Sequence, residues 1–478
     1  MNNARQGKWV STVRLFTLLL PCFVSLSSLG EQANDPYFNS SGSWEQPYDD
    51  QWGLKRVGFS QDKNSAWTQA DGSAQPVIVA VIDTGLDYHH PDLDKSNLWH
   101  NPHEQKNNRD DDGNGYVDDL IGWDFIDSDA RPWDRTGHGT FVVGIIAASR
   151  NNGLGIAGIN AGVKIMPLRA LNFMGRGRSV NIAAAIYYAV ANGARIINLS
   201  LGSRHVSRIE TDAIAYATKQ NVLVVVAGGN EGKATGDDGL AGLVEVITVG
   251  ASDINDKRAS FSNWGDEVDV VAPGVDILSL RARRTDLAYV AGVEDYRLGS
   301  NVVGIDKMLY RTTGTSFAAP FVTGVASLLV ANNPKLTPAQ VKRMILQSAR
   351  DIETPGKDEL TGYGLLDADA ALTADPEFFI KADLQSVAVI QKGGSSLLQV
   401  TGTADANKIK KAWLEIGKGE NPGSWKKLIK RIKTPTDNAV LGQFSTSRLA
   451  GSKQWTLRLF VEHKNGRKRE GRLALNLD

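Results

Sequence analysis

The feature that most constrains the fold is a series of short runs that are apolar throughout. The runs end in polar or glycine-rich segments, such as Asp83-Thr84-Gly85 and Gly228-Gly229-Asn230. Strands buried on both faces read as continuous apolar runs, whereas strands with one solvated face alternate. The runs cover residues 76–82, 195–201, 222–227, 244–249 and 268–272, and helical patterns between them cover 139–149, 180–192 and 209–219. This rhythm predicts an α/β fold in which helices cover a parallel sheet in three layers.

The pattern changes after Asp375. Short alternating segments cover residues 395–401, 411–416 and 455–462, with turn signals at 420–423 and 464–466. Alternation separated by turns predicts antiparallel strands, and the length fits a small β-sandwich. We therefore expect three parts: a leader at residues 1–30, an α/β domain at 31–375, and a basic antiparallel β-sandwich at 376–478.

The leader has the pattern of a secretory signal peptide. Arg5, Lys8 and Arg14 precede or open an apolar run over residues 15–29, which ends in small residues. We place cleavage after Gly30, which would also remove Cys22, the only cysteine in the chain. The alternative is an uncleaved N-terminal anchor, although the run is short for a full span. The sequence predicts a secreted protein, extracellular or periplasmic, without a transmembrane anchor after cleavage.

The chain is neutral overall, but its two main parts differ in charge. It holds 53 Lys and Arg against 53 Asp and Glu. Residues 376–478 carry 19 basic and 9 acidic side chains, which leaves 34 and 44 for the rest. The overall balance and the lack of a base-reading motif argue against a nucleic-acid partner. The basic part would serve solubility and docking on the acidic domain, or it would attach the protein to an anionic surface or polymer.

Four polar residues lie at expected strand ends or helix starts, positions that suit a catalytic site. His138 lies between glycines and opens a helical pattern, and Ser316 begins the long apolar helix that runs to about residue 332. A serine at a helix N-terminus has an unpaired N–H beside it, and a nearby histidine can take its proton. Asp83, after a buried strand, suits the carboxylate that orients the histidine, and Asn230 suits the second donor to an oxyanion.

These residues and their surroundings resemble the subtilisin-like serine proteases of the subtilase family. The matching motifs are Ala80–Gly85, Gly137–Thr140, Gly229–Gly232 and Gly314–Pro320, in this order. The resemblance implies an endopeptidase acting on polypeptides through Asp83, His138 and Ser316, with Asn230 in the oxyanion hole. It also implies that Ser200, Leu201, Gly202 and Gly229 contact the substrate. The alternative function is an inactive secreted binding protein on the same scaffold.

The sequence departs from the family at three positions near the expected site. Phe141 and Phe321 stand where the family usually has histidine, and Phe317 stands where it usually has methionine. None belongs to the expected triad, but all three make its surroundings more apolar and bulkier. A further hypothesis concerns Asp237 and Asp238 in the short loop at 236–239. A carboxylate facing the specificity pocket would favour Lys or Arg before the cut, and the alternative is a solvated turn.

Two groups of oxygen-bearing residues predict Ca²⁺. Asp110, Asp112 and Asn114 alternate before a glycine at the sixth position, and Asp118 or Asp119 closes the loop. This spacing resembles the first part of an EF-hand loop, and closely spaced carboxylates repel one another without a cation. The family resemblance implies a second group, Asp35, Asp92 and Asn152. Oxygen ligands favour calcium over zinc.

Overall fold

The computed structural model describes residues 33–62, 65–69, 76–202, 207–236, 239–432 and 434–477. The predicted signal peptide, residues 1–30, lies outside the described residues. So do Asp237 and Asp238, on which the specificity hypothesis rests.

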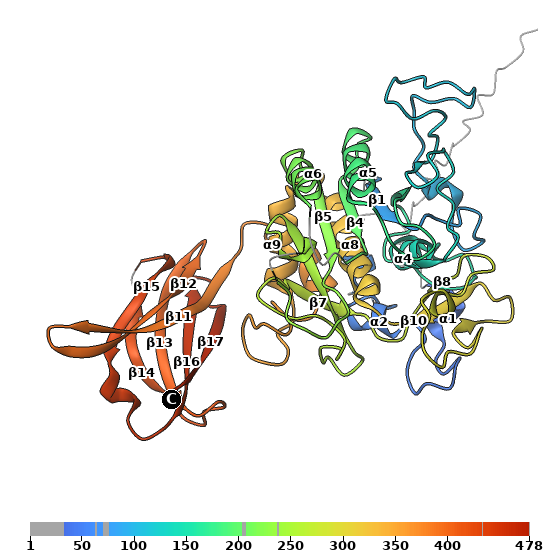
Figure 1. Ribbon diagram of the computed structural model, residues 1–478. Helices are drawn as coiled ribbons and strands as arrows, with labels where there is room; N and C mark the ends of the chain where they lie inside the picture. Colours follow the sequence, from blue (N-terminus) through green and yellow to red (C-terminus); the bar gives the residue numbers. More distant parts are fainter. Residues whose placement is uncertain are drawn as a thin grey trace, which may run out of the picture. The chain divides into compact units, whose positions relative to one another are not determined.

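A seven-stranded parallel sheet forms the centre of the α/β part of the chain (Figure 1). Its strand order is β2-β3-β1-β4-β5-β6-β7. The strands are β1 (Ile78–Asp83), β2 (Trp123–Asp124), β3 (Lys164–Arg169), β4 (Ile196–Leu199), β5 (Leu223–Ala227), β6 (Val246–Ser252) and β7 (Val270–Pro273). All five predicted strands are present and parallel to their neighbours. The sequence analysis predicted neither β2, which has only two residues, nor β3, whose apolar run contains Pro167 and has a charged residue at each end.

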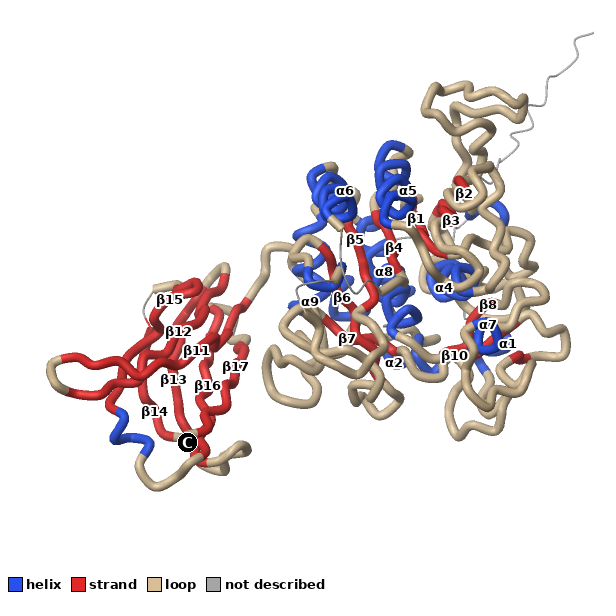
Figure 2. The backbone as a smooth tube through the Cα atoms, viewed as in Figure 1, coloured by secondary structure: helices blue, strands red, loops and turns tan. Residues whose placement is uncertain are grey.

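Helices cover both faces of this sheet (Figure 2). On one face lie α4 (His138–Ala147) and α8 (Thr315–Asn332), and on the other lie α5 (Ser179–Ala191) and α6 (Arg208–Lys219). Successive residues of β1 point to opposite faces: Val79 and Val81 join the core under α4 and α8, whereas Ala80 and Ile82 join the core under α5 and α6. The predicted three-layer fold is confirmed.

Helix α8 is the centre of the larger core. Every residue from Phe317 to Ala331 is buried, and the helix packs against β4, β5, β6 and β7. Within the described part of the chain it is also the one helix long and apolar enough to cross a membrane, but 89% of that stretch is buried inside the protein. Its apolar character is therefore accounted for by the core.

Shorter elements surround the sheet. A three-stranded antiparallel sheet has the order β8-β10-β9, formed by Ile277–Leu280, Leu309–Thr312 and Val302–Val303. The remaining helices are α1 (Pro36–Asn39), α2 (Trp52–Arg56), α3 (Ala66–Gln69), α7 (Leu287–Val290), α9 (Pro338–Ser348) and α10 (Ala368–Leu372). The 3₁₀ helices are η1 (Lys95–Asn97), η2 (Leu240–Gly242) and η3 (Thr446–Leu449).

The C-terminal part consists of two antiparallel sheets, as predicted. One has the order β11-β12-β15, and the other has the order β14-β13-β16-β17. The strands are β11 (Ile380–Lys392), β12 (Ser395–Ala406), β13 (Ile409–Lys418), β14 (Lys426–Ile432), β15 (Thr436–Ser445), β16 (Gln454–His463) and β17 (Lys468–Asn476). Side chains from both sheets, among them Val400, Leu414 and Leu459, form one buried core. The predicted boundary at 375–376 falls in the connection between α10 and β11.

Candidate active site

Asp83 and His138 form a hydrogen-bonded pair at the carboxyl end of β1. Asp83 ends this strand and is completely buried, while His138 is the first residue of α4. The His138 Nδ1 lies 2.8 Å from the Asp83 Oδ1. The histidine side chain is 21% exposed, so its other edge can be reached from solvent. The pair has the geometry in which a carboxylate fixes the tautomer of an imidazole.

Burial lowers the pKa of His138, but nearby carboxylates raise it by more. The charge of Asp83, the hydrogen bond from Asp83 and the charge of Asp134 all favour the imidazolium, so the net direction is upward from the ordinary value. The site therefore stabilises the protonated histidine that forms when it accepts a proton.

Asp134 anchors the turn that leads into His138, and the sequence reading missed it. Its Oδ1 accepts bonds from the Gly137 N–H at 2.8 Å and the Thr84 hydroxyl at 2.9 Å. Its Oδ2 accepts from the N–H and hydroxyl of Thr140, at 2.9 and 2.7 Å. The Thr84 hydroxyl in turn accepts from the Gly139 N–H at 2.9 Å. One buried carboxylate thus ties the end of β1 to the first turn of α4. The sequence did offer a signal for Asp134: it is a carboxylate four residues before the histidine that opens the helix.

Ser316 is the second residue of α8 and is partly exposed. Its carbonyl oxygen accepts a bond from the Ser200 hydroxyl at 2.7 Å. The next residue, Phe317, places its ring centroid 5.2 Å from that of His138, so the segments that carry the serine and the histidine meet here. The N–H of Ser316 lies in the first helical turn, where no intrahelical carbonyl is available to it. It can therefore donate to a bound oxyanion.

Asn230 is exposed and follows β5, and Thr315 fixes the direction of its amide. The Asn230 Oδ1 accepts from the Thr315 N–H at 2.8 Å and from the Thr315 hydroxyl at 2.9 Å. The same hydroxyl accepts from the Gly229 N–H at 3.1 Å. With its oxygen held in this way, Asn230 has its Nδ2 left to donate at the start of α8. Thr315 is a second residue that the sequence reading missed.

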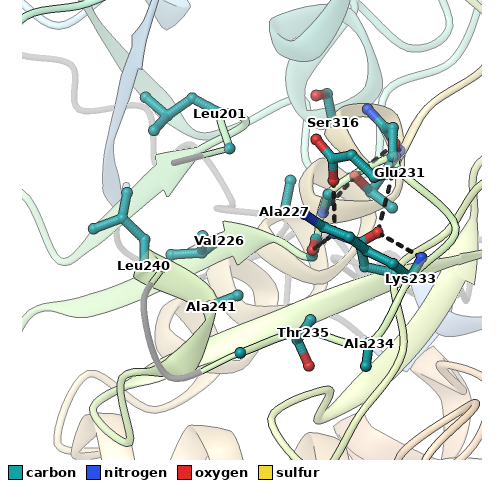
Figure 3. A pocket seen from close by; sticks show the side chains of 18 residues that line it. Leu201, Val226, Ala227, Glu231, Lys233, Ala234, Thr235, Leu240, Ala241 and Ser316 are labelled. Atoms are coloured by element: carbon teal, nitrogen blue, oxygen red, sulfur yellow. Dashed lines mark hydrogen bonds between the residues drawn. The ribbon is translucent and has the colours of Figure 1, made fainter. Parts of the chain in front are cut away.

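A pocket of about 480 Å³ opens beside Ser316. Its lining includes Leu201, Gly202, Gly229 and Asn230, four of the predicted site residues. In the view of Figure 3, Ser316 and Glu231 lie on one side of the pocket, and Leu201 with Leu240 lies on the other. Glu231 accepts a bond from the Asn263 Nδ2 at 2.7 Å. The pocket therefore combines apolar walls with a fixed carboxylate.

The three phenylalanines that depart from the family pattern pack beneath the site. Phe141 and Phe317 place their ring centroids 4.5 Å apart, and Phe317 also contacts His138. Phe321 is completely enclosed and would clash with any side chain at Gly53. The rings of Phe141 and Phe317 pack next to the histidine, Phe321 packs in the core near Gly53, and the Asp83–His138 bond is in place.

The second predicted calcium group is brought together by the fold. Asp35 and Asp92 are completely buried, and the Asn152 Nδ2 donates to the Asp92 Oδ1 at 2.8 Å. Asp35 accepts from the Asn152 N–H at 3.4 Å. Burial raises the pKa of Asp92 to about 7, and the charge of Asp35 adds to the rise. Two buried carboxylates and an exposed amide offer oxygen donors of the kind that calcium prefers.

The loop at 110–119 groups some of the predicted side chains with one that was not predicted. Oxygens of Glu104, Asp112 and Asp119 lie within 4.8 Å of one another, and the Asn114 Nδ2 donates to both Asp112 and Asp119 at 3.1 Å. Asp112, Asn114 and, as one of two closing residues, Asp119 were predicted, whereas Glu104 was missed because it precedes the loop. Asp110 accepts instead from the N–H groups of Gly113, Asn114 and Gly115. Asn114 accepts from the Tyr116 N–H, and Asp118 accepts from those of Asn107 and Asn108.

A carboxylate–histidine pair beside a serine at a helix N-terminus, with an amide donor next to it, has the chemistry of a serine hydrolase. The comparisons with known proteins agree with this class. The model of the subtilase family (peptidase S8) matches residues 74–364, a range that includes Asp83, His138, Asn230 and Ser316. The chain belongs to the subtilase family.

Several named relatives are serine proteases. The chain is 38% identical over 309 residues to a thermophilic serine proteinase of Bacillus sp. (strain AK1), covering 64% of each chain. It is 31% identical over 450 residues to the cell wall-associated protease of Bacillus subtilis, covering 86% of this chain and 42% of that one. The chain thus spans less than two thirds of the length of these two relatives. Thermitase of Thermoactinomyces vulgaris is 34% identical over 62% of this chain and 85% of its own.

Solved structures show the same fold. A protease of Pseudoalteromonas arctica matches with a TM-score of 0.53 and 28% identity, over 72% of this chain and 99% of that chain. A lanthipeptide protease matches with a TM-score of 0.52 and 28% identity, over 68% and 93% of the two chains.

Proposed function

We propose that this protein is a secreted, calcium-stabilised serine endopeptidase that hydrolyses peptide bonds in polypeptides. The observation that carries the proposal is the 2.8 Å Asp83–His138 bond beside the N-terminus of α8, where Ser316 and Asn230 lie. Secretion rests on the leader pattern of the sequence, with its basic start and apolar core at residues 1–30.

In the proposed reaction, the Ser316 Oγ attacks the carbonyl carbon of the scissile peptide bond. His138 accepts the hydroxyl proton and then donates it to the leaving amine. Asp83 keeps the imidazole in the required tautomer and stabilises its protonated form. The Asn230 Nδ2 and the Ser316 N–H donate to the oxyanion of the tetrahedral intermediate, and water then hydrolyses the acyl-enzyme.

Leu201, Gly202 and Gly229 line the pocket next to Ser316, and we assign them to substrate binding. Ser200 acts indirectly, because its hydroxyl holds the Ser316 carbonyl. The apolar wall that Leu201 forms with Leu240 favours an apolar substrate side chain, and Glu231 offers a carboxylate at the other side. Cleavage-site profiling with a peptide library measures which of these features dominates.

We also propose that calcium stabilises the fold at two places. Asp35, Asp92 and Asn152 would hold one ion, and Glu104, Asp112 and Asp119 would hold the other. A cation at the first place would offset the repulsion between two buried carboxylates, which is otherwise costly. The ions have a structural role here, so no catalytic step depends on them.

Labelling with a fluorophosphonate probe tests the proposed activity. The probe reacts with a serine that a histidine base activates, so the folded protein should label at Ser316 and the heat-unfolded protein should not. Ser316→Ala should abolish labelling, and the matched control Ser395→Ala, at an exposed position of β12, should label like the parent. A folded protein that does not label would favour the alternative, an inactive binding protein on a protease scaffold.

A further inference from the structure

The Asp83–His138 bond fixes one edge of the imidazole but not the plane of its ring. It holds the ring at Nδ1, and the ring can still turn about the line that joins the two side chains. Proton transfer needs the other nitrogen, Nε2, to face the Ser316 hydroxyl at hydrogen-bond distance. A displacement of about 1 Å can cost a factor on the order of 10² in rate. A second contact that limits this rotation would therefore raise the rate of the proposed reaction.

Phe317 supplies such a contact. Its ring centroid lies 5.2 Å from that of His138, with an angle of 47° between the two planes. The Phe317 side chain is buried, so it is shielded from solvent and from a substrate. It also follows Ser316 directly in α8. One side chain thus connects the segment that carries the nucleophile with the histidine.

The Phe317 ring is itself held from two sides. The Phe141 ring packs against it, with centroids 4.5 Å apart. Phe141 lies three residues after His138 in α4, so these two side chains share one face of that helix. The backbone at Gly314 closes another side, because a Cβ placed there would lie 3.3 Å from the nearest atom of the Phe317 ring. The ring is therefore wedged between α4 and the start of α8.

The support for Phe141 comes from outside α4. Phe141 is completely buried, and its carbonyl oxygen accepts a bond from the Ser279 hydroxyl at 2.7 Å. Ser279 belongs to β8, which lies so close to α4 that a side chain at Gly144 would collide with it. The helix that carries His138 and Phe141 is thus fixed on the neighbouring sheet, and Phe317 packs against a surface with little freedom to move.

Phe321 shows how a phenylalanine of the same helix packs when it serves the core alone. It lies one turn after Phe317 in α8 and is also buried. It packs at α2, where its ring would lie 2.8 Å from a Cβ placed at Gly53. Both phenylalanines contribute to the core, but the ring of Phe317 contacts the imidazole. The two positions therefore separate a stabilising role from a role in the reaction.

We propose that Phe317 is a positioning residue for the peptidase reaction. Its ring, wedged between His138 and Phe141, limits the rotation of the imidazole so that Nε2 faces the Ser316 hydroxyl. Phe141 acts one step farther away, because it keeps the Phe317 ring in place. This role rests on the proposed function, since it affects a rate only if His138 acts as a base toward Ser316.

Steady-state hydrolysis of a peptide by Phe317→Leu tests the proposal, with Ca²⁺ present and below the Tm of every variant. The loss of the ring should lower kcat by about tenfold or more. KM should stay within about twofold of the parent value, because orientation of the base acts on the transition state more than on substrate binding. The rate of fluorophosphonate labelling at Ser316 should fall by a factor similar to that in kcat.

Phe321→Leu is the matched control. It removes the same ring from the same helix, so the Tm of both variants should fall by comparable amounts. Its kcat should remain within about twofold of the parent value, because this ring packs at α2. Near-parent kcat and labelling in Phe317→Leu, or equal losses of kcat in both variants, would overturn the proposal.

Phe141→Leu provides a second test, which also serves if Phe317→Leu does not fold. The Phe317 ring loses its support in this variant, so kcat should fall by about threefold or more. Near-parent kcat in a folded Phe141→Leu protein would likewise overturn the proposal. A parent protein that neither hydrolyses peptides nor labels would refute the proposed function itself, whereas full activity in both the parent and Phe317→Leu would refute only the role of Phe317.

Discussion

In the α/β part of the chain, the carboxylates of Asp83 and Asp134 are buried, whereas the sandwich carries exposed lysines on one sheet face. Asp134 receives bonds from four residues around the first turn of α4. Lys427 and Lys468, in contrast, are exposed, and their ammonium groups lie over the Trp413 ring. Groups that take part in bond cleavage need a fixed position, and the donors around Asp134 supply it for the turn that carries His138. An exposed lysine keeps the freedom of its long side chain.

The largest expected effect is the loss of hydrolysis in Ser316→Ala. Removal of the nucleophile should lower kcat by a factor on the order of 10⁶, a magnitude taken from subtilisin and not from this structure. The Tm should remain unchanged, because Ser316 is partly exposed and lies outside the core. Peptide hydrolysis and thermal melting measure the two quantities. Near-parent hydrolysis by a folded Ser316→Ala protein would refute the nucleophile assignment.

Asn230→Ala should have the next largest effect on hydrolysis. It removes one of two oxyanion donors, and a loss on the order of 10²–10³ in kcat is expected, again by analogy with subtilisin. The change should appear in kcat more than in KM, because the donor acts on the transition state. Near-parent kcat in a folded Asn230→Ala protein would refute the oxyanion assignment.

Chelation of calcium tests two acidic clusters, one around Asp92 and one around Asp112, of which only Asp112 is exposed. A ligand that binds only the folded state stabilises it by about 2.7 kcal/mol at a hundredfold excess over Kd. The Tm of the Ser316→Ala protein should therefore fall in EDTA and recover in Ca²⁺. Asp92→Asn and Asp112→Asn should each remove part of this response, and Asp295→Asn, at an exposed loop position, should not. Identical melting in EDTA and in millimolar Ca²⁺ would contradict both proposed sites.

The smallest expected effect is a shift in the pH profile of Asp134→Asn. His138 must be neutral to act as a base, so labelling by the fluorophosphonate should fall as the pH falls through the pKa of His138. This pKa lies above its ordinary value, and the charge of Asp134 contributes to the rise. Without that charge the imidazolium is less stable, so the acid limb should move to lower pH. An unmoved or upward-shifted limb in a protein with near-parent Tm would contradict this role for Asp134.

The sequence predicted the structure best where a residue type has a single structural role. Continuous apolar runs predicted five strands of the parallel sheet, and glycines around His138 and Ser316 marked the functional turns. Strand β3 was not predicted, because Pro167 and its charged ends break the apolar run. Its place in the sheet depends on hydrogen bonds to β1 and β2, which the apolar pattern of the sequence does not show. Thr315 and Asp134 were missed for a related reason. Their importance depends on bonds to residues as far as 86 positions away, and spacing along the chain does not encode such bonds.

The burial of α8 determines how heating would inactivate the proposed peptidase. Ser316 stands on a helix that packs against four strands of the central sheet, so partial opening of a peripheral loop cannot displace it. Backbone amides of α8 should exchange with deuterium only through global unfolding, whereas amides of the exposed loop at 105–115 should exchange through local fluctuations. Heating should therefore abolish activity and melt the core of the α/β region in a single transition. At no lower temperature should the sheet stay folded while Ser316 is disordered.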